Sequence, residues 1–323
     1  MDEATGDPTG AGVINSGSLL TAGTGGSSTI TWSSPPRDRE FLFIIGAAKA
    51  GTTSLHAYLN AHAGVHMSSP KEPHFFARAI KPSIRTKSWD TYADAFRGAT
   101  ENAILGDASP SYLWDPASAG LIHEALPDSR IVVLLRDPVA RAISHYAMDV
   151  RNGSQRQSFD DALRADAAIR ERIWGFKSHL YIDLGMYAAQ VRRYLDTFGL
   201  DRLLVLESAT LRKSRRAVLT QIARFHGIDP SGFDEARLDD EYNPMAMPRS
   251  IQLNYVARRP TMRQVSKILP AGVRSAIRRR LTSQGPRIRL ETRRRLQDHF
   301  APDVDALRDL TGLPLQSLTS KWR

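Results

Sequence analysis

The sequence predicts an α/β fold of three layers, in which helices flank a central parallel sheet. Four short segments have the composition of strands, and the longest of them are continuous apolar runs, which is typical of strands buried on both faces. Segments with helical spacing alternate with them, and this alternation favours a parallel sheet covered on both sides. With 323 residues, the chain is long enough for one large domain of this kind.

The predicted strands lie at residues 41–45, 104–107, 130–135 and 203–206. After the first strand comes a glycine-rich turn, and then Leu55, Tyr58 and Leu59 have the spacing of a helix that runs to about residue 61. Pro138 follows the third strand, in the first turn of a helix that runs to about residue 150. Other helical patterns lie at residues 187–198, 214–226, 291–300 and 303–310, and the C-terminal third shows no strong strand.

The first 37 residues are rich in glycine, serine and threonine, so we expect a disordered tail followed by a single domain at residues 38–323. The net charge of +10 is regional, because residues 249–299 contain 14 Lys and Arg against 2 Asp and Glu. This basic segment, within about residues 240–300, indicates either an anionic partner or a solvated basic face. The partner could be a phosphorylated cofactor, an acidic glycan, a membrane surface or a nucleic acid.

Three features that the sequence lacks narrow the classes of protein that fit it. There is no cysteine, which excludes disulfides, thiolate metal sites and cysteine nucleophiles. No apolar stretch reaches the length of about 18 residues that a transmembrane helix needs, and the N-terminus lacks the pattern of a secretory signal. We therefore expect a cytoplasmic protein, with peripheral attachment to a membrane as an alternative.

The strongest local signal is the run GAAKAGTTS at residues 46–54, where a buried strand turns into a helix. Backbone N–H groups converge at such a turn and bind anions. Gly46 and Gly51 have the spacing of a P-loop, but Thr52 stands in the usual lysine position and Lys49 lies inside the loop. We see no clear metal-binding aspartate, so a 5'-phosphosulfate fits this P-loop-like turn better than a metal-chelated triphosphate.

A second motif, VVLLRDPVARAISHY at residues 132–146, supports the first. Together they resemble the phosphate-binding motifs of sulfotransferases that use 3'-phosphoadenosine-5'-phosphosulfate (PAPS), especially the heparan-sulfate-type and bacterial carbohydrate enzymes. The resemblance spans about residues 41–228, with a weaker echo from residue 243 onward. It implies that Arg136 and Ser144 bind the 3'-phosphate, since an arginine fork and a hydroxyl suit a terminal phosphate. It also implies that the loop binds the 5'-phosphosulfate through Lys49, Ala50, Gly51, Thr52, Thr53 and Ser54.

The resemblance implies a reaction as well. The sulfuryl group of PAPS moves in line to a hydroxyl or amine of an acceptor, a carbohydrate or glycolipid, and 3',5'-diphosphoadenosine (PAP) is released without a required metal. Lys49 is expected to stabilise charge in the transition state. Glu72 matches the glutamate base of the heparan-sulfate-type enzymes, and His74 is the alternative base, with a pKa suited to neutral pH. Phe75 and Phe76 beside His74 also allow it to be a packed wall residue.

Some positions depart from the family pattern or stay open. Ala108 stands where heparan-sulfate-type enzymes carry a lysine, so a second cation is missing there or comes from elsewhere. Asp107 either binds the acceptor, assists the base or caps a turn before Pro110. Arg249 is a candidate for the missing part of the 3'-phosphate site. The adenine-stacking residue is open among Trp174, Phe176 and Tyr181.

Two other functions remain as alternatives at this point. A P-loop kinase or nucleoside triphosphatase would need Mg²⁺, and the absence of a lysine after Gly51 argues against it. A nucleic-acid-binding protein could use the basic segment, but no helix-turn-helix, zinc-finger or RNA-recognition motif is present. The basic segment could also recruit an acidic glycan or lipid surface as acceptor. The identity of the acceptor cannot be predicted from these residues.

Overall fold

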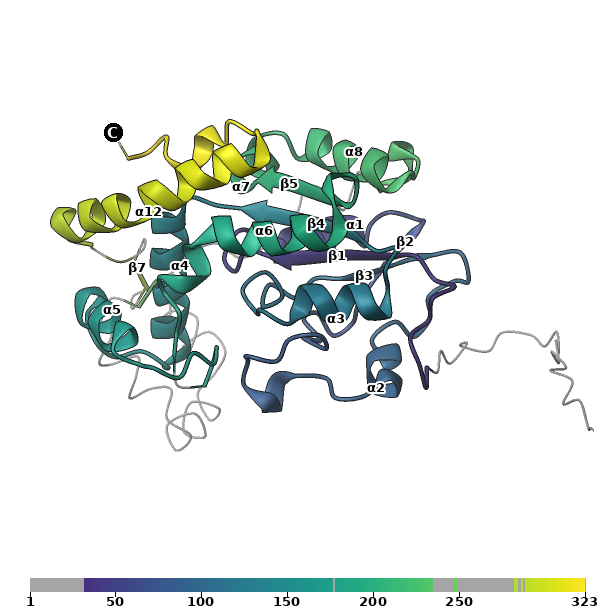
Figure 1. Ribbon diagram of the computed structural model, residues 1–323, viewed down its shortest axis with the longest axis horizontal. Coiled ribbons are helices and arrows are strands. Elements are labelled where there is room, and N and C mark those ends of the chain that lie inside the picture. Colours follow the sequence, from purple (N-terminus) through teal and green to yellow (C-terminus); the bar gives the residue numbers. More distant parts are fainter. Residues whose placement is uncertain are drawn as a thin grey trace, which may run out of the picture.

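The computed structural model of the protein describes residues 32–176, 178–234, 247–248, 282–283, 286 and 288–322. Its centre is a parallel sheet of five strands in the order β2-β3-β1-β4-β5 (Figure 1). These strands are β1 (Phe41–Gly46), β2 (Val65–Met67), β3 (Ile104–Asp107), β4 (Arg130–Leu135) and β5 (Leu203–Glu207). All four strands expected from the sequence are present, and every strand pair of this sheet is parallel.

The strand that sequence reasoning missed is β2, at one edge of the sheet. It has three residues, of which Val65 and Met67 are buried and His66 is half-buried, so it is too short to produce a recognisable period. Met67 packs directly over Gly106 of β3, where a Cβ atom would lie 2.1 Å from the methionine sulfur. The glycine therefore lets the edge strand close against the sheet.

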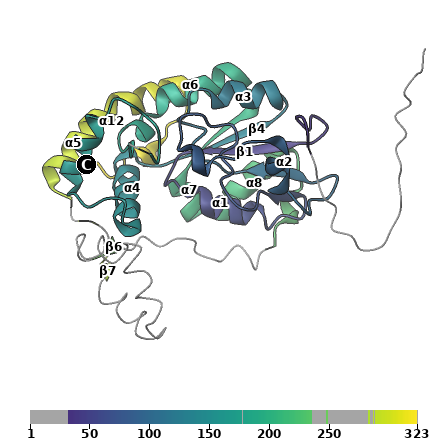
Figure 2. The ribbon, with the colours of Figure 1, turned by 90° about the horizontal axis from the view of Figure 1, so that it is seen from below.

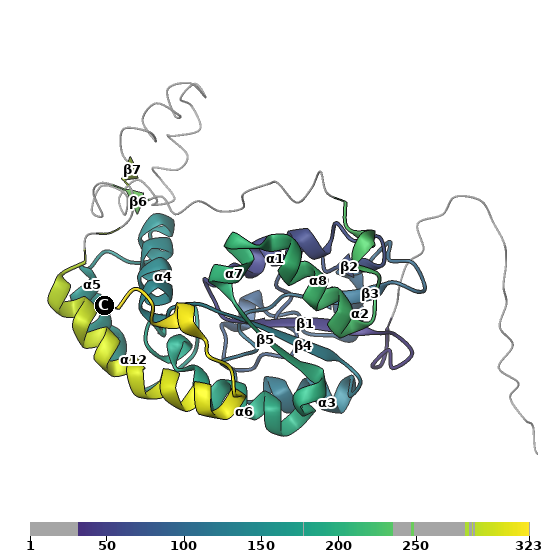
Figure 3. The ribbon, with the colours of Figure 1, turned by 90° about the horizontal axis from the view of Figure 1, so that it is seen from above.

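Helices cover the sheet on both faces, as predicted for three layers. Figures 2 and 3 show one group on one face and another on the opposite face, with the strands between them. The first group is α1 (Thr52–Leu59), α7 (Ser208–Lys213) and α8 (Arg215–His226). The second group is α3 (Ser118–Ala125), α6 (Tyr187–Phe198) and α12 (Leu290–Thr311). Both faces of β1 and β4 are consequently buried, which explains their continuous apolar sequence.

Other elements lie outside these layers. In Figure 1, α4 (Pro138–Asn152) stands beyond the arrowhead of β4, and α5 (Phe159–Ala167) lies beside it. The short helix α2 (Trp89–Asp94) lies at the β3 side of the sheet. Two-residue strands β6 (Met247–Pro248) and β7 (Thr282–Ser283) form a separate antiparallel pair. Short 3-10 turns lie at Pro82–Ile84, Asp183–Gly185, Leu200–Arg202, Pro230–Gly232 and Gln316–Leu318.

The two helical patches near the C-terminus form one helix, α12, which continues through Pro302. Proline normally ends or kinks a helix because it lacks an N–H group. Here the buried stripe passes the proline, with Phe300 before it and Val304 after it, both fully buried in the core. Burial of this stripe offsets the lost hydrogen bond, and it explains why the patches join. None of the helices in the described part of the chain is both long and apolar enough to span a bilayer.

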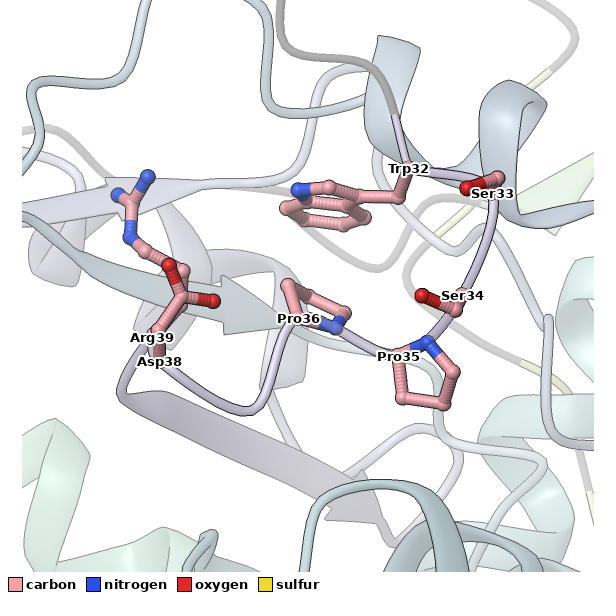
Figure 4. A pocket seen from close by; sticks show the side chains of 7 residues that line it. All are labelled: Trp32, Ser33, Ser34, Pro35, Pro36, Asp38 and Arg39. Carbon is pink, nitrogen blue, oxygen red and sulfur yellow. The ribbon is translucent and has the colours of Figure 1, made fainter. Parts of the chain in front are cut away.

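The folded domain includes residues on the N-terminal side of the boundary expected at residue 37. The Trp32 side chain is 9% exposed and packs against Phe41, Tyr92 and Phe96 at centroid distances of 5.9, 6.0 and 5.7 Å. From Trp32 to Arg39 the chain curves around a shallow cavity (Figure 4). Because this cavity precedes β1, it lies at the opposite end of the sheet from the loop that follows β1. Residues 32–37 therefore belong to the folded domain.

Candidate active site

The candidate site lies at the carboxyl ends of β1 and β4, the two strands at the centre of the sheet. The chain runs from β1 outward to β2 and β3 on one side and then returns to β4 on the other. Ligands of open parallel sheets bind at such a reversal of strand order, outside the carboxyl ends. Two segments start at this point: the run at residues 46–54 after β1, which we call the phosphate loop, and the turn after β4 that contains Arg136.

Two glycines shape the phosphate loop. A Cβ atom at Gly46 would lie 2.8 Å from the Cβ atom of Leu113, so glycine is required for close packing there. Gly51 has a φ of 108° and is the N-cap residue of α1. Thr52, Thr53 and Ser54 fill the first turn of α1, whose N–H groups have no partner within the helix. The loop therefore offers backbone donors and a positive helix end to an anion.

Arg136 is joined to this loop. Its Nη1 donates a hydrogen bond of 2.7 Å to the carbonyl oxygen of Lys49, and its own carbonyl oxygen accepts one of 2.9 Å from Tyr187. Ser144 lies further along α4 and is 7% exposed. Arg249 and most of the basic segment at residues 249–299 lie outside the described residues. The structure thus brings Arg136 to the loop and places Ser144 on the helix that follows it.

Two aspartates bear on the kinase alternative. Asp137 caps α4 by accepting hydrogen bonds from Val139 and Ala140, and it also accepts one from the Trp322 indole. Asp107 is fully buried and accepts hydrogen bonds from three side chains. Both carboxylates hold the protein fold together rather than facing a nucleotide. Among the described residues, no group of three or more acidic, histidine or cysteine side chains is arranged to hold a metal.

Asp107 is fully buried and bonded to protein side chains, which argues against the direct contact with the acceptor that was left open for it. Its oxygens accept hydrogen bonds of 2.9 Å from Tyr92, 2.8 Å from Tyr112 and 2.7 Å from Ser109. Burial raises the pKa of Asp107 to about 6, although these hydrogen bonds oppose the rise. Ser109 in turn accepts a 3.0 Å hydrogen bond from the backbone N–H of His74. Asp107 therefore acts through Ser109 and helps to position His74.

The two candidate bases lie side by side. The Nε2 atom of His74 is 3.7 Å from Oε2 of Glu72, and its Nδ1 lies 2.8 Å from the Ser111 hydroxyl. The Lys71 ammonium forms an ion pair with Glu72. Burial lowers the pKa of His74, partly opposed by Glu72, so the imidazole is neutral near pH 7. The Glu72 side chain is 38% exposed, against 8% for His74, so the carboxylate is the more accessible of the two groups.

Backbone strain gathers at the same residues. Five non-glycine residues in the described part of the chain have a positive φ, and they include Lys49 (69°), Glu72 (65°) and His74 (52°). Such conformations cost on the order of 1–3 kcal/mol and persist where surrounding contacts enforce them, often at functional sites. All three residues expected to act in catalysis carry this strain, which supports a shared functional position.

A cavity of ≈ 350 Å³ is lined by Glu72 and His74 and by residues of α4. Its lining also includes Met148 and Asp149 of α4, together with Trp174, Phe176 and His179. The Lys49 ammonium lies 3.3 Å from the sulfur of Met148, at the edge of this cavity. Burial lowers the pKa of Lys49, and the neighbouring Arg151 and Arg136 lower it further, against the opposing charges of Glu72 and Asp149.

The cavity lining contains residues that sequence reasoning missed, among them Asp149 and His179. The spacing of His145 and Asp149 by one helical turn was visible in the sequence, but nothing there pairs either with His179. Of the residues considered for adenine stacking, Trp174 and Phe176 line this cavity. Tyr181 is fully buried and donates a hydrogen bond to Asp149, so it has no open face for a base.

Comparisons with known proteins agree with this geometry. Residues 39–256 match the family model described as a sulfotransferase domain. Mouse heparan sulfate glucosamine 3-O-sulfotransferase 3A1 is 28% identical over 187 residues, covering 57% of this chain and 45% of that protein. Human carbohydrate sulfotransferase 15 is 22% identical over 284 residues, covering 71% and 49%. The chain thus spans about half the length of the curated relatives it matches.

The crystal structure of a sulfotransferase from Alicyclobacillus acidocaldarius has the same fold. It matches with a TM-score of 0.65 and 27% identity, covering 87% of this chain and 98% of that one. The phosphate loop, the Arg136 turn and the adjoining cavity all lie within the residues that match the family model. The chain therefore belongs to the sulfotransferase family.

Proposed function

We propose that this protein transfers the sulfuryl group of PAPS to a hydroxyl or amine of an acceptor, and that the acceptor is a carbohydrate or glycolipid. One observation carries the proposal: Lys49 belongs to the phosphate loop, while its ammonium reaches Met148 at the edge of the cavity. A single cation thus lies between a site for a phosphate and a space for an acceptor. Kinase and nucleic-acid-binding functions lack comparable support from the family.

The residues present fit a donor with two anionic ends. The N–H groups in the first turn of α1 suit the 5'-phosphosulfate, whereas the N–H of Ala50 in the loop already donates to the carbonyl oxygen of Ala47. Arg136, with Ser144 on the helix behind it, suits the 3'-phosphate. The proposal also includes Arg249 as a residue that binds the 3'-phosphate. Arg136 also donates a hydrogen bond to the carbonyl oxygen of Lys49. Binding of the 3'-phosphate is therefore coupled to the shape of the loop that would hold the 5'-phosphosulfate.

In the proposed reaction, the acceptor oxygen or nitrogen forms a bond to sulfur as the bond from sulfur to the 5'-phosphate oxygen breaks. PAP is the leaving group, and the acceptor proton passes to Glu72. Lys49 stabilises negative charge on the sulfuryl and bridging oxygens, and its lowered pKa favours hydrogen-bond donation. Neutral His74 lies beside the Glu72 carboxylate, with its Nε2 atom 3.7 Å from Oε2. The protein's main contribution is alignment and charge stabilisation.

The carbohydrate class is supported by the relatives named above, of which one acts on heparan sulfate and one is a carbohydrate sulfotransferase. The cavity supports it too, because it combines polar side chains with the aromatic residues Trp174 and Phe176. Sites for small molecules commonly combine apolar and aromatic walls with a few polar groups.

The decisive experiment is calorimetric titration with PAP and, separately, with ATP and Mg²⁺, followed by an assay of transfer from radiolabelled PAPS to a glycan panel. We expect metal-independent PAP binding and labelled glycan. Lys49→Ala should cut transfer by roughly 10²–10³-fold, while Lys81→Ala, a change at an exposed lysine, should not. Mg²⁺-dependent ATP binding without PAP binding would refute the proposal.

A further inference from the structure

One part of the cavity lining is built around a single carboxylate oxygen. Oδ2 of Asp149 lies 2.8 Å from Nδ1 of His179 and accepts a hydrogen bond of 2.8 Å from the Tyr181 hydroxyl. The Nε2 atom of His145 lies 3.6 Å from the same oxygen. Asp149 and His179 both line the cavity. The Asp149–His179 pair therefore faces the space in which the acceptor is expected.

The segment that carries His179 is held rigidly. One oxygen of Asp166 accepts hydrogen bonds from the His179 N–H and the Ser178 hydroxyl, and the other accepts one from the Tyr181 N–H. Leu180, between the two bonded N–H groups, has a φ of 56° and packs beside Ala48 of the phosphate loop. The imidazole of His179 also stacks on Tyr181, with ring centroids 5.0 Å apart and an angle of 3° between the planes. These contacts fix the ring relative to the loop.

The pairing with Asp149 leaves one nitrogen of His179 for a ligand. Hydrogen bonding to His179 and Tyr181 holds the pKa of Asp149 below its usual value even though burial opposes this, so Asp149 is ionised and accepts. The His179 Nδ1–H therefore donates to Asp149, and Nε2 is the remaining polar atom of the ring. No described side chain bonds to Nε2, and the His179 side chain is 28% exposed at the cavity.

We propose that His179, oriented by Asp149, binds a second hydroxyl group of the acceptor, in the same cavity as Glu72. The acceptor then carries at least two hydroxyl groups on one ring or on adjacent rings. One lies between Lys49 and Glu72, and the other bonds Nε2 of His179. Trp174 and the 57%-exposed Phe176 offer aromatic faces to the apolar face of a sugar. This inference rests on the proposed function and extends it by saying how the acceptor is held.

The test measures binding of small probes to the protein saturated with PAP. The probes are methyl β-D-glucopyranoside, which has several hydroxyl groups, and cyclohexanol, which has one. Their dissociation constants are measured by saturation-transfer NMR for the wild type, His179→Ala, His179→Gln and Asp149→Asn. His123→Ala is the control, because His123 is an exposed histidine on α3, away from the cavity. PAP affinity and the melting temperature of each variant are measured in parallel.

We expect His179→Ala to weaken glucoside binding roughly 5- to 15-fold, the loss of about one hydrogen bond. Asp149→Asn should show a smaller loss, and His179→Gln should recover part of the affinity because its amide can still bond a hydroxyl. Cyclohexanol binding and PAP affinity should stay within about twofold. His123→Ala should match the wild type for both probes.

Three outcomes would overturn the inference: glucoside affinity unchanged in His179→Ala, an equal loss for both probes, or no glucoside binding to a protein that binds PAP. The equal loss would mean that His179 only packs the wall. If the wild type does not bind PAP at all, the proposed function fails instead. If His179→Ala does not fold, Asp149→Asn and His179→Gln decide in its place.

Discussion

Arg136 donates a hydrogen bond of 2.7 Å from Nη1 to the carbonyl oxygen of Lys49. The guanidinium that is expected to hold the 3'-phosphate thus also holds the backbone of the residue expected to act on the sulfuryl group. The two motifs recognised in the sequence, one after β1 and one after β4, meet through this contact. It links binding of the donor to the alignment of Lys49.

The first prediction concerns this contact. Arg136→Ala should weaken PAP binding by roughly 10- to 150-fold, since a hydrogen bond to a charged group contributes about 1.5–3 kcal/mol. It should also lower turnover at saturating PAPS, because the Lys49 backbone loses its partner. Calorimetry and initial rates measure the two effects. Arg202→Ala, which removes a surface ion pair with Asp128, is the control and should change neither. Unchanged PAP affinity in Arg136→Ala would remove Arg136 from the donor site.

The second prediction separates the two candidate bases. Glu72→Gln should lower kcat by roughly 10²–10⁴-fold and leave PAP affinity within about twofold, because the amide keeps the shape but cannot take a proton. His74→Gln should have a smaller effect, since His74 is buried and held by Ser109 and Ser111. Glu101→Gln, at an exposed glutamate, is the matched control. If His74→Gln abolishes turnover while Glu72→Gln is active, His74 is the base.

These predictions rest on contiguous motifs, and such motifs are what sequence reasoning could use. The apolar run of β1, the glycines of the loop and Pro138 at the start of α4 lie close together in the chain. Their local geometry follows from backbone preferences and burial. The four longest strands, the three-layer architecture and the positions of Lys49 and Arg136 could therefore be predicted.

What could not be predicted depends on contacts between distant segments or on overridden local preferences. The pairing of His179 with Asp149 joins residues 30 positions apart, and no local pattern indicates it. Strand β2 is too short for a period, and its place is fixed by Met67 packing over Gly106. Pro302 signals a break in α12, but the buried stripe around it maintains the helix. In each case packing decides the outcome.

The third prediction concerns pH. The folded-state pKa of Asp107 is about 6, above the ordinary value of 3.8, so the folded protein binds this proton more tightly than the unfolded chain. Asp107 therefore favours the folded state most below about pH 4, and this contribution is lost as the pH rises through about 6. The difference between these two pKa values of Asp107 corresponds to roughly 3 kcal/mol in the free energy of unfolding.

The test compares the free energy of unfolding of the wild type and Asp107→Asn by urea denaturation between about pH 4.5 and 7.5. The stability of the wild type relative to the variant should fall as pH rises across this range. Buried His145, whose pKa is lowered to about 3 by burial, changes stability in the opposite direction. It is present in both proteins, so its effect cancels in the difference. A difference that does not vary with pH would show that Asp107 is not protonated in this range.

The fourth prediction locates the start of the folded domain. Removal of residues 1–31 should leave the free energy of unfolding unchanged, whereas removal of residues 1–37 should lower it by roughly 3 kcal/mol, because it also deletes the buried Trp32. Trp32→Ala in the full chain should reproduce most of that loss. Both effects are measured by urea denaturation, and PAP affinity should be unaffected because Trp32 lies at the other end of β1 from the phosphate loop. Equal stability of the two truncated proteins would mean that the contacts of Trp32 with Phe41, Tyr92 and Phe96 add nothing to the fold.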